Sequence, residues 1–170
     1  MEQIKTERLT LRQFTLSDAE FIVELVNEPS FIQNIGDRGV QTISDAEKYL
    51  ENGAFSSYAR NGFGLLAVTL NSTGQPIGMC GLIKRDALED VDIGYAFLPK
   101  FWSKGYALES AQAVMNHAKE VVGLKRVVAI VDPANAGSIR LLEKIGMAFE
   151  KMMKLSDDDI DLKLFSISLS

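Results

Sequence analysis

The fold is decided by the stretch VDIGYAFLPKFWSKGYALES, which spans residues 91–110. Its opening run has the apolar pattern of a strand, and Pro99 closes that run. From Lys104 onward apolar residues recur at the helical period, and Gly123 marks the expected end of the helix. The sequence therefore predicts a strand and a helix that are joined at the segment FWSKGYALES.

The same order of elements continues toward the C-terminus. The run RVVAIVD, residues 126–132, is almost continuously apolar, which is typical of a strand buried on both faces. A short helix is predicted from about Asn135 to Ile145, because Asn135 is a good N-cap and Gly146 follows. Two closing strands are predicted at about residues 147–155 and 160–168. Strands and helices that alternate in this way predict a mixed α/β sheet.

The first half of the chain predicts antiparallel strand pairs and two helices. Residues 8–14, RLTLRQF, alternate as in a half-buried strand. The spelling Ser-Asp-Ala-Glu, which is typical of a capping box, occurs at Ser17 and again at Ser44. It predicts two helices, which end near Pro29 and Arg60. Two further strands joined by a hairpin turn are predicted at residues 63–70 and 76–85.

The composition is that of an ordinary globular protein. The 170 residues are 46% hydrophobic and 24% charged, and this length suits a single domain over residues 1–170. The formal net charge of −5 argues against a nucleic-acid partner, because such proteins carry a basic excess. It is compatible with a cationic or amine substrate.

Few residues suited to metal or disulfide chemistry are present. With one cysteine, Cys80, and one histidine, His117, the sequence predicts neither a disulfide framework nor a metal site. Cys80 lies inside a predicted strand, which favours a buried structural thiol. His117 falls off the apolar stripe of its helix, which favours an exposed surface position.

The hydropathy pattern excludes a membrane partner. No apolar run approaches the roughly 20 residues that span a bilayer. The start MEQIKTERLT also lacks the apolar core of a secretory signal. We therefore expect a cytoplasmic protein.

The junction segment is the best candidate for an anion site. No G-x-x-x-x-G-K-[ST] motif occurs, and GFGLLA at residues 62–67 leads into a strand where a dinucleotide site would open a helix. The first turn of a helix presents unpaired N–H groups and the positive end of its dipole. Gly105 and Ala107 are small enough to let the backbone approach an anion, and Lys104 adds a positive charge. The alternative is a plain helix start, with Trp102 as a packing residue.

Three polar side chains are expected near this junction. Asn135 and Ser138 are three residues apart at the start of their helix, so they share one face. They either bind one polar ligand or cap their own helix, and capping is the more frequent role. On the strand, Asp92 shares a face with Gly94 and Ala96, which leaves room for a ligand above the sheet. The alternative is that Asp92 is an exposed edge residue.

Taken together, these segments resemble the GNAT superfamily of acetyl-coenzyme A-dependent N-acetyltransferases, and within it the RimJ/RimL-type branch. The likeness runs from TERLTLRQF, residues 6–14, through the closing strands. It rests on WSKGYA at residues 102–107 and ANAGSIRLLEKIGM at residues 134–147, which occur in the family's order. The resemblance implies an α/β (α+β) fold with a central mixed, splayed sheet of about seven strands and about four flanking helices.

The resemblance also implies a binding mode for acetyl-CoA as the co-substrate. Its pyrophosphate would rest on the backbone N–H groups of residues 103–107, although Ser103 stands where the branch commonly has glycine. Its pantetheine arm would pair with the backbone near Phe97 and Leu98, and Asn135 would hydrogen-bond the pantetheine or the nearby backbone. The full set of implied donor-binding residues is Phe97, Leu98, Trp102, Ser103, Lys104, Gly105, Tyr106, Ala107, Asn135 and Ser138.

The implied chemistry is direct attack of a neutral primary amine on the thioester, without an acyl-enzyme. Asp92 matches the strand position at which many family members carry a glutamate as general base. Because aspartate is one methylene shorter, proton transfer through a water is expected. Ser138 is the expected proton donor to the leaving thiolate, since no tyrosine follows in its helix. A backbone N–H near Leu98 is expected to polarise the thioester oxygen.

The acceptor is left open by the sequence. A protein N-terminus and a small-molecule amine both fit, and recognition is expected from the first two helices, the loop at residues 34–42 and the final hairpin. An acetyl-CoA-binding sensor or scaffold without turnover is the alternative from another class, and O- or S-acyl transfer is a third. A homodimer and a non-acetyl acyl group also stay open.

Overall fold

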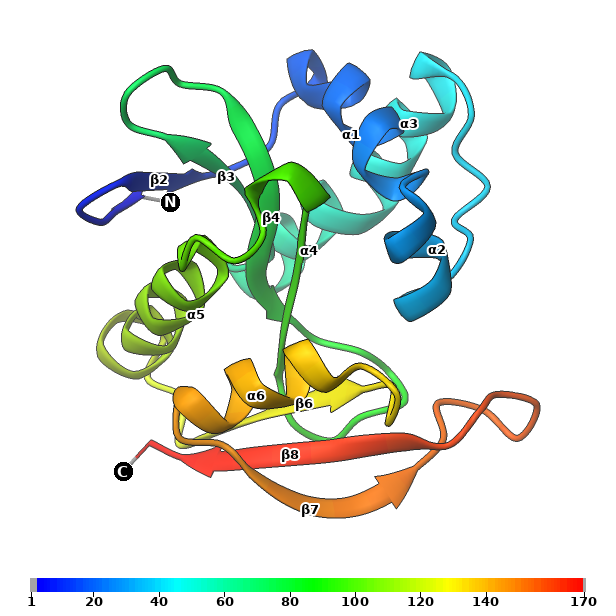
Figure 1. Ribbon diagram of the computed structural model, residues 1–170, viewed down its shortest axis with the longest axis vertical. Helices are drawn as coiled ribbons and strands as arrows, with labels where there is room; N and C mark the ends of the chain where they lie inside the picture. The colour runs from blue at the N-terminus through cyan, green and yellow to red at the C-terminus, as the bar shows by residue number, and fades with distance from the viewer. Residues whose placement is uncertain (1–2, 170) are drawn as a thin grey trace.

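The computed structural model describes residues 3–169, and these fold around one eight-stranded mixed sheet (Figure 1). Neighbouring strands are antiparallel except for β5 and β6, which are parallel. In spatial order the strands are β1 (Ile4–Lys5), β2 (Leu9–Arg12), β3 (Leu65–Leu70), β4 (Pro76–Ile83), β5 (Asp92–Phe97), β6 (Arg126–Val131), β8 (Leu162–Ser168) and β7 (Ala148–Met153). The mixed sheet is as predicted. Strand β1 is additional, because two residues carry no periodic signal.

The parallel strands β5 and β6 are paired only where they begin. Their register consists of Asp92 opposite Val128, whereas β4 and β5 stay paired as far as Gly78 opposite Phe97. Because β5 follows β4 while β6 pairs along its whole length with β8, the two strands separate toward their carboxyl ends. The predicted splay of the sheet is confirmed. It opens a gap at the point where ligands of α/β sheets enter.

Helices cover both faces of the sheet. In Figure 1, α1–α3 lie on one side of strands β3–β5 and α5 lies on the other. A π-helical turn, Glu51–Phe55, joins α3 to α4, so the helix predicted to end near Arg60 is continuous. Helix α2 is not among the predicted helices. It begins at Pro29, where the first helix is expected to end, because proline suits the first position of a helix. The helices are α1 (Ala19–Val26), α2 (Pro29–Asn34), α3 (Ile43–Leu50), α4 (Ser56–Asn61), α5 (Tyr106–His117) and α6 (Ala136–Lys144).

Among residues 3–169, two large apolar clusters, one on each face, form most of the core, and a small third cluster consists of Leu88, Val128 and Leu164. The larger packs α5 and α6 onto the sheet, and the other packs α1–α3 onto the opposite face. Strand β5 contributes to both, because alternate residues point to opposite faces. Ile93 and Phe97 face α5, whereas Ala96 faces the α1–α3 side. The predicted parity of this strand is therefore confirmed.

Both predicted capping boxes are wrong by two residues. The N-cap of α3 is Thr42, whose hydroxyl accepts from the Asp45 N–H at 3.0 Å while Asp45 accepts from the Thr42 N–H. The corresponding pair before α1 is Thr15 and Asp18. In both places a threonine with extended backbone and an aspartate three residues later satisfy the first amides. The glutamates that completed the predicted boxes, Glu20 and Glu47, lie two residues beyond the aspartates that form the actual ones.

Cys80 is fully buried in β4, as predicted, and burial raises the pKa of its thiol. His117 is half-buried instead of exposed, and burial lowers the pKa of its imidazole. Among residues 3–169, no group of histidine, cysteine and acidic side chains could hold a metal ion. None of the helices formed by these residues has the length and apolar character to cross a membrane.

Candidate active site

One cavity of about 640 Å³ passes through the gap between β5 and β6. Its wall on one side comes from the start of α5 and the start of α6, and on the other side from α2, α3 and the end of β4. All the site residues predicted from the sequence line this cavity except Leu98 and Lys104. The fold therefore brings segments far apart in the chain into one space.

The start of α5 presents unpaired backbone amides. Its N-cap is Gly105, in a left-handed conformation with φ of +84°, and no side chain caps the helix. The first intrahelical bond runs from the Glu109 N–H to the Gly105 carbonyl at 3.0 Å, so the three amides before Glu109 have no carbonyl to reach within the helix. Ser103 also has a positive φ, of 61°. The helix begins at Tyr106 and not at Lys104 as predicted, because the left-handed turn occupies the intervening residues.

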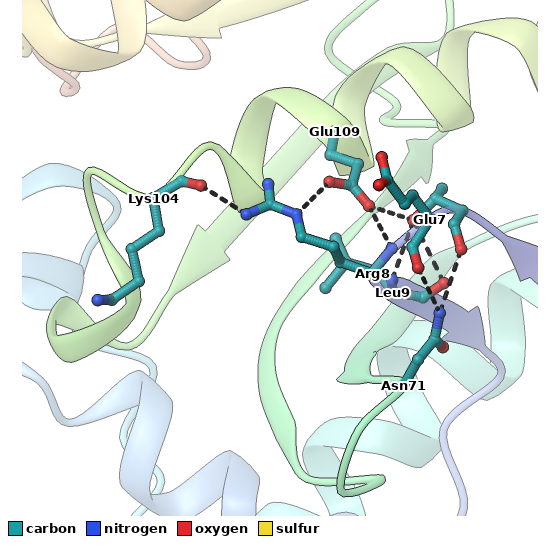
Figure 2. Close-up of polar contacts among 7 residues, drawn as sticks. Glu7, Arg8, Leu9, Asn71, Lys104 and Glu109 are labelled. Atoms are coloured by element: carbon teal, nitrogen blue, oxygen red, sulfur yellow. Dashed lines mark hydrogen bonds and ion pairs between the residues drawn. The ribbon is translucent and has the colours of Figure 1, made fainter.

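A strap from the N-terminal strands holds this turn in place (Figure 2). Arg8 donates from Nη1 to the Lys104 carbonyl at 2.9 Å and from Nε to Glu109 Oε1 at 2.8 Å. Its guanidinium lies 4.4 Å from the ring centroid of Tyr106. Thr6 and the Arg8 backbone N–H both donate to Glu109 Oε2. Burial alone would raise the pKa of Glu109, but these hydrogen bonds and the Arg8 charge outweigh it and hold the pKa low.

The backbone N–H and C=O groups of the odd-numbered residues of β5 point into the gap between β5 and β6. The Leu98 N–H donates to the Ile77 carbonyl of β4 at 3.0 Å, so it is not free to polarise a thioester as predicted. Because hydrogen-bonding directions alternate along an antiparallel strand, the N–H groups of Tyr95 and Phe97 point away from β4 and toward the gap. The Phe97 carbonyl already accepts from Trp102 Nε1 at 2.9 Å. Trp102 thus fixes the end of β5.

Asp92 is a buried carboxylate at the start of the gap. Its side chain is 1% exposed, so the alternative of an exposed edge residue is wrong. Arg85 Nε lies 3.1 Å from Oδ1 and 3.4 Å from Oδ2. Burial raises the pKa of Asp92 to about 6, and the Arg85 charge and hydrogen bond limit this rise. Such a carboxylate is mostly ionised at neutral pH and holds a proton readily just below it.

Ser138 forms a hydroxyl pair with a residue that the sequence analysis missed. The Tyr95 and Ser138 hydroxyl oxygens are 2.5 Å apart, across the gap from β5 to α6. Burial raises the pKa of Tyr95 to about 12, so its phenol stays protonated at neutral pH. Asn135 caps its helix by accepting from the Ser138 N–H at 3.2 Å. Strand parity places Tyr95 on the face of β5 that does not carry Asp92. Only the position of α6 shows that the Tyr95 hydroxyl meets the Ser138 hydroxyl.

The wall on the far side of the gap carries three further polar side chains that the sequence did not single out. Arg38 follows α2, Tyr49 lies on α3 and Arg85 follows β4, and all three line the cavity. Burial raises the pKa of Tyr49, while the positive charges of Arg38 and Arg85 act to lower it. Both arginines therefore contribute to the electrostatic environment of the Tyr49 phenol.

Comparisons with known proteins agree with this geometry. Residues 8–148 match the profile described as the acetyltransferase (GNAT) domain. The chain is 29% identical over 151 residues to the uncharacterized N-acetyltransferase YnaD of Bacillus subtilis (strain 168), covering 89% of this chain and 85% of YnaD. It is 27% identical to an acetyltransferase (GNAT family) from Bacillus anthracis, with 99% of both chains covered and a TM-score of 0.82.

A third likeness concerns the fold alone. The structure of RimL, a ribosomal L7/L12 alpha-N-protein acetyltransferase in complex with coenzyme A, superposes with a TM-score of 0.84 at 19% identity. The superposition covers 99% of this chain and 98% of RimL.

Proposed function

We propose that this chain, which belongs to the GNAT acetyltransferase family, is a single-domain N-acetyltransferase that moves an acetyl group from acetyl-CoA to a primary amine. The observation that carries this proposal is the single cavity that joins the unpaired amides of α5 to the buried Asp92 carboxylate through the sheet gap. A donor bound on one side can thereby meet an acceptor that arrives from the other.

The donor side fits a coenzyme pyrophosphate. The amides of residues 105–108 and the positive end of the α5 dipole provide an anion site without a dedicated cation. A Cβ on Gly105 would be strained at this φ and would lie 3.2 Å from Arg8 Nη2, so glycine keeps the backbone open to the ligand. The Tyr95 and Phe97 amides in the gap are the strand partners we propose for the pantetheine arm. Asn135 has its Nδ2 left to donate to it, because its Oδ1 caps α6.

The acceptor amine needs a base. Acetyl-CoA supplies a thioester carbonyl as the electrophile and a thiolate as the leaving group. Asp92 accepts the proton that the attacking amine must lose, directly or through one water, as the new C–N bond forms. Arg85 Nε fixes the orientation of the Asp92 carboxylate for this transfer.

The leaving sulfur needs a proton as the C–S bond breaks. The Tyr95 and Ser138 hydroxyls together supply it, with Ser138 as the proposed donor, Tyr95 as the group that replaces its proton, and solvent returning a proton to the Tyr95 phenol, whose pKa is raised. The short separation of the two oxygens suits such a relay. The Phe97 N–H, in place of the Leu98 N–H, is the backbone group available to the thioester oxygen.

The experiment that tests this function is thiol release from acetyl-CoA in the presence of a panel of amines and peptide N-termini. We expect release that depends on the amine and an N-acetylated product by mass spectrometry. Tight coenzyme binding with no amine-dependent release near neutral pH would indicate a sensor or scaffold instead. A product that is an ester or a thioester would indicate O- or S-acyl transfer. Acetyl as the acyl group, a cytoplasmic location and a homodimer stay predictions.

A further inference from the structure

The acceptor half of the cavity carries positive charge that the donor does not explain. Four cationic side chains line the whole cavity. Arg140 and Lys144 belong to α6, on the donor side, where a phosphorylated coenzyme accounts for them. Arg38 and Arg85 lie across the sheet gap, next to α2 and at the end of β4. Of the acidic side chains that the structure describes, only Asp92 and Asp132 line the cavity.

Both acceptor-side arginines have N–H donors that no group of the described residues uses. Within residues 3–169, Arg38 is exposed and makes no hydrogen bond or ion pair with the protein. Arg85 uses only Nε, which bonds Asp92, and its two terminal nitrogens have no protein partner in the same part of the chain. Guanidinium groups with unused parallel N–H donors are well suited to carboxylates and phosphates.

Tyr49 lines the same cavity as the two arginines. The charges of Arg38 and Arg85 both act on the pKa of its phenol, in the direction opposite to burial. The two arginines therefore contribute positive charge to the part of the cavity that Tyr49 lines. Because Arg85 and Asp92 form an ion pair, the unpaired charge of Arg38 is left uncompensated, and it would disfavour a polycationic acceptor.

We propose that the acceptor is an amine that also carries a carboxylate, which Arg38 and the terminal nitrogens of Arg85 bind while the amine faces Asp92. This inference rests on the proposed transferase function. The amine and the carboxylate of the acceptor must lie close together. Arg85 bonds Asp92 through Nε, and its terminal nitrogens, which would bind the carboxylate, belong to the same rigid guanidinium. Amino acids, and peptides that begin with an acidic residue, have this chemistry. The acidic net charge of the chain, −5, is thus opposite to the charge of its acceptor site.

The test compares matched acceptors. Thiol release is measured with amino acids and their carboxamides, with short peptides whose first residue is Asp or Asn, and with O-phosphoserine against serine. We expect kcat/KM for the best carboxylate acceptor to exceed that of its amide by about tenfold or more. Arg38→Met should remove most of this preference by lowering kcat/KM for the acid, and should leave the amide nearly unchanged. Arg60→Met, an exposed arginine on α4 outside the cavity, is the matched control and should change neither.

Each outcome decides between the two proposals. Equal rates for acids and amides, or equal losses for both in Arg38→Met, would overturn the carboxylate acceptor and leave the transferase standing. A preference for O-phosphoserine over every carboxylate would replace the carboxylate by a phosphate. Absence of thiol release from all amines would reject the transferase, and the acceptor proposal with it. Calorimetric binding of the N-acetylated acid and its amide gives the same comparison without turnover.

Discussion

At the scale of single residues, the environment of Asp92 suits the role of general base that we propose for it. A solvent-exposed aspartate is too weak a base to take a proton from an amine near neutral pH, because its pKa lies near 4. Burial of Asp92 opposes the charged form, while Arg85 supports it, and the balance raises the pKa to about 6. A base poised just below neutral pH is both ionised and able to hold a proton.

This balance predicts the pH dependence of the reaction. Because Asp92 must be deprotonated to act, kcat/KM should rise with pH through about 6 and then level until other groups titrate. Asp92→Asn should lower kcat by about 10²–10⁴ and remove this limb. Coenzyme binding, measured by calorimetry, should be unchanged and serves as the folding control. A limb near pH 6 that persists in Asp92→Asn would assign it to another group.

The hydroxyl pair gives a second prediction at this scale. Tyr95→Phe and Ser138→Ala should each lower kcat by about ten- to a hundredfold, because either change interrupts the supply of a proton to the sulfur. Coenzyme affinity should change little, since neither hydroxyl is assigned to the pyrophosphate site. Steady-state kinetics together with calorimetric binding separate the two effects. A loss of affinity that accounts for the whole loss of rate would make the pair a binding element.

The residues of the site differ in how far the sequence could predict them. Strand parity and helix spacing are local, so the sequence could single out Asp92 and Ser138, while the roles proposed for them come from the family resemblance. Arg38, Arg85 and Tyr95 could not be singled out, because their roles depend on which distant element faces them. Arg85 comes next to Asp92 only because β4 and β5 pair in this register. Arg38 comes to the cavity only because the loop after α2 reaches it.

At the scale of elements, local sequence signals predicted the presence of the helices more accurately than the residue at which each helix begins. A threonine stands two residues before each Ser-Asp-Ala-Glu spelling. This threonine acts as the cap because its backbone is extended. The start of α5 was placed too early for a related reason. A left-handed glycine delays the helix to Tyr106, and a periodic pattern does not record φ.

The strap from Arg8 to the α5 turn predicts a linkage between the N-terminal strands and coenzyme binding. Arg8→Ala removes the bond to the Lys104 carbonyl, the ion pair with Glu109 and the contact with the Tyr106 ring (Figure 2). We expect coenzyme affinity to fall about three- to tenfold because the amides lose their fixed orientation. Calorimetry checks this change.

A matched variant separates the parts of the strap. Arg8→Lys keeps the charge but cannot reach both partners with one planar group, so its affinity should lie between those of the wild type and Arg8→Ala. If Arg8→Ala binds the coenzyme as tightly as the wild type, the turn holds its shape without the strap.

At the scale of the whole molecule, the sheet gap is both the proposed binding site and the place where the sheet is least paired. A single register pair joins β5 to β6, so the half of the sheet that carries β6, β8 and β7 is tied to the rest by few backbone bonds. The splay was predictable only through the family resemblance, since two strand patterns do not reveal how far they stay paired. A ligand that spans α5, β5 and α6 should therefore stabilise the native state as a unit.

We therefore expect coenzyme binding to raise the melting temperature Tm. A ligand at about one hundred times its Kd stabilises the native state by about 2.7 kcal/mol. For a domain of this size each kcal/mol raises Tm by about 2–4 °C, so coenzyme A should raise Tm by about 5–10 °C. Gly105→Glu should abolish this shift, because a carboxylate and its bulk would occupy the pyrophosphate site at a φ of +84°. Gly123→Glu has a similar φ of +79° at the far end of the same helical segment, and it controls for backbone strain alone. If the Gly105→Glu protein keeps the full shift, the coenzyme binds elsewhere. If both variants lose it, strain and not the blocked anion site is the cause.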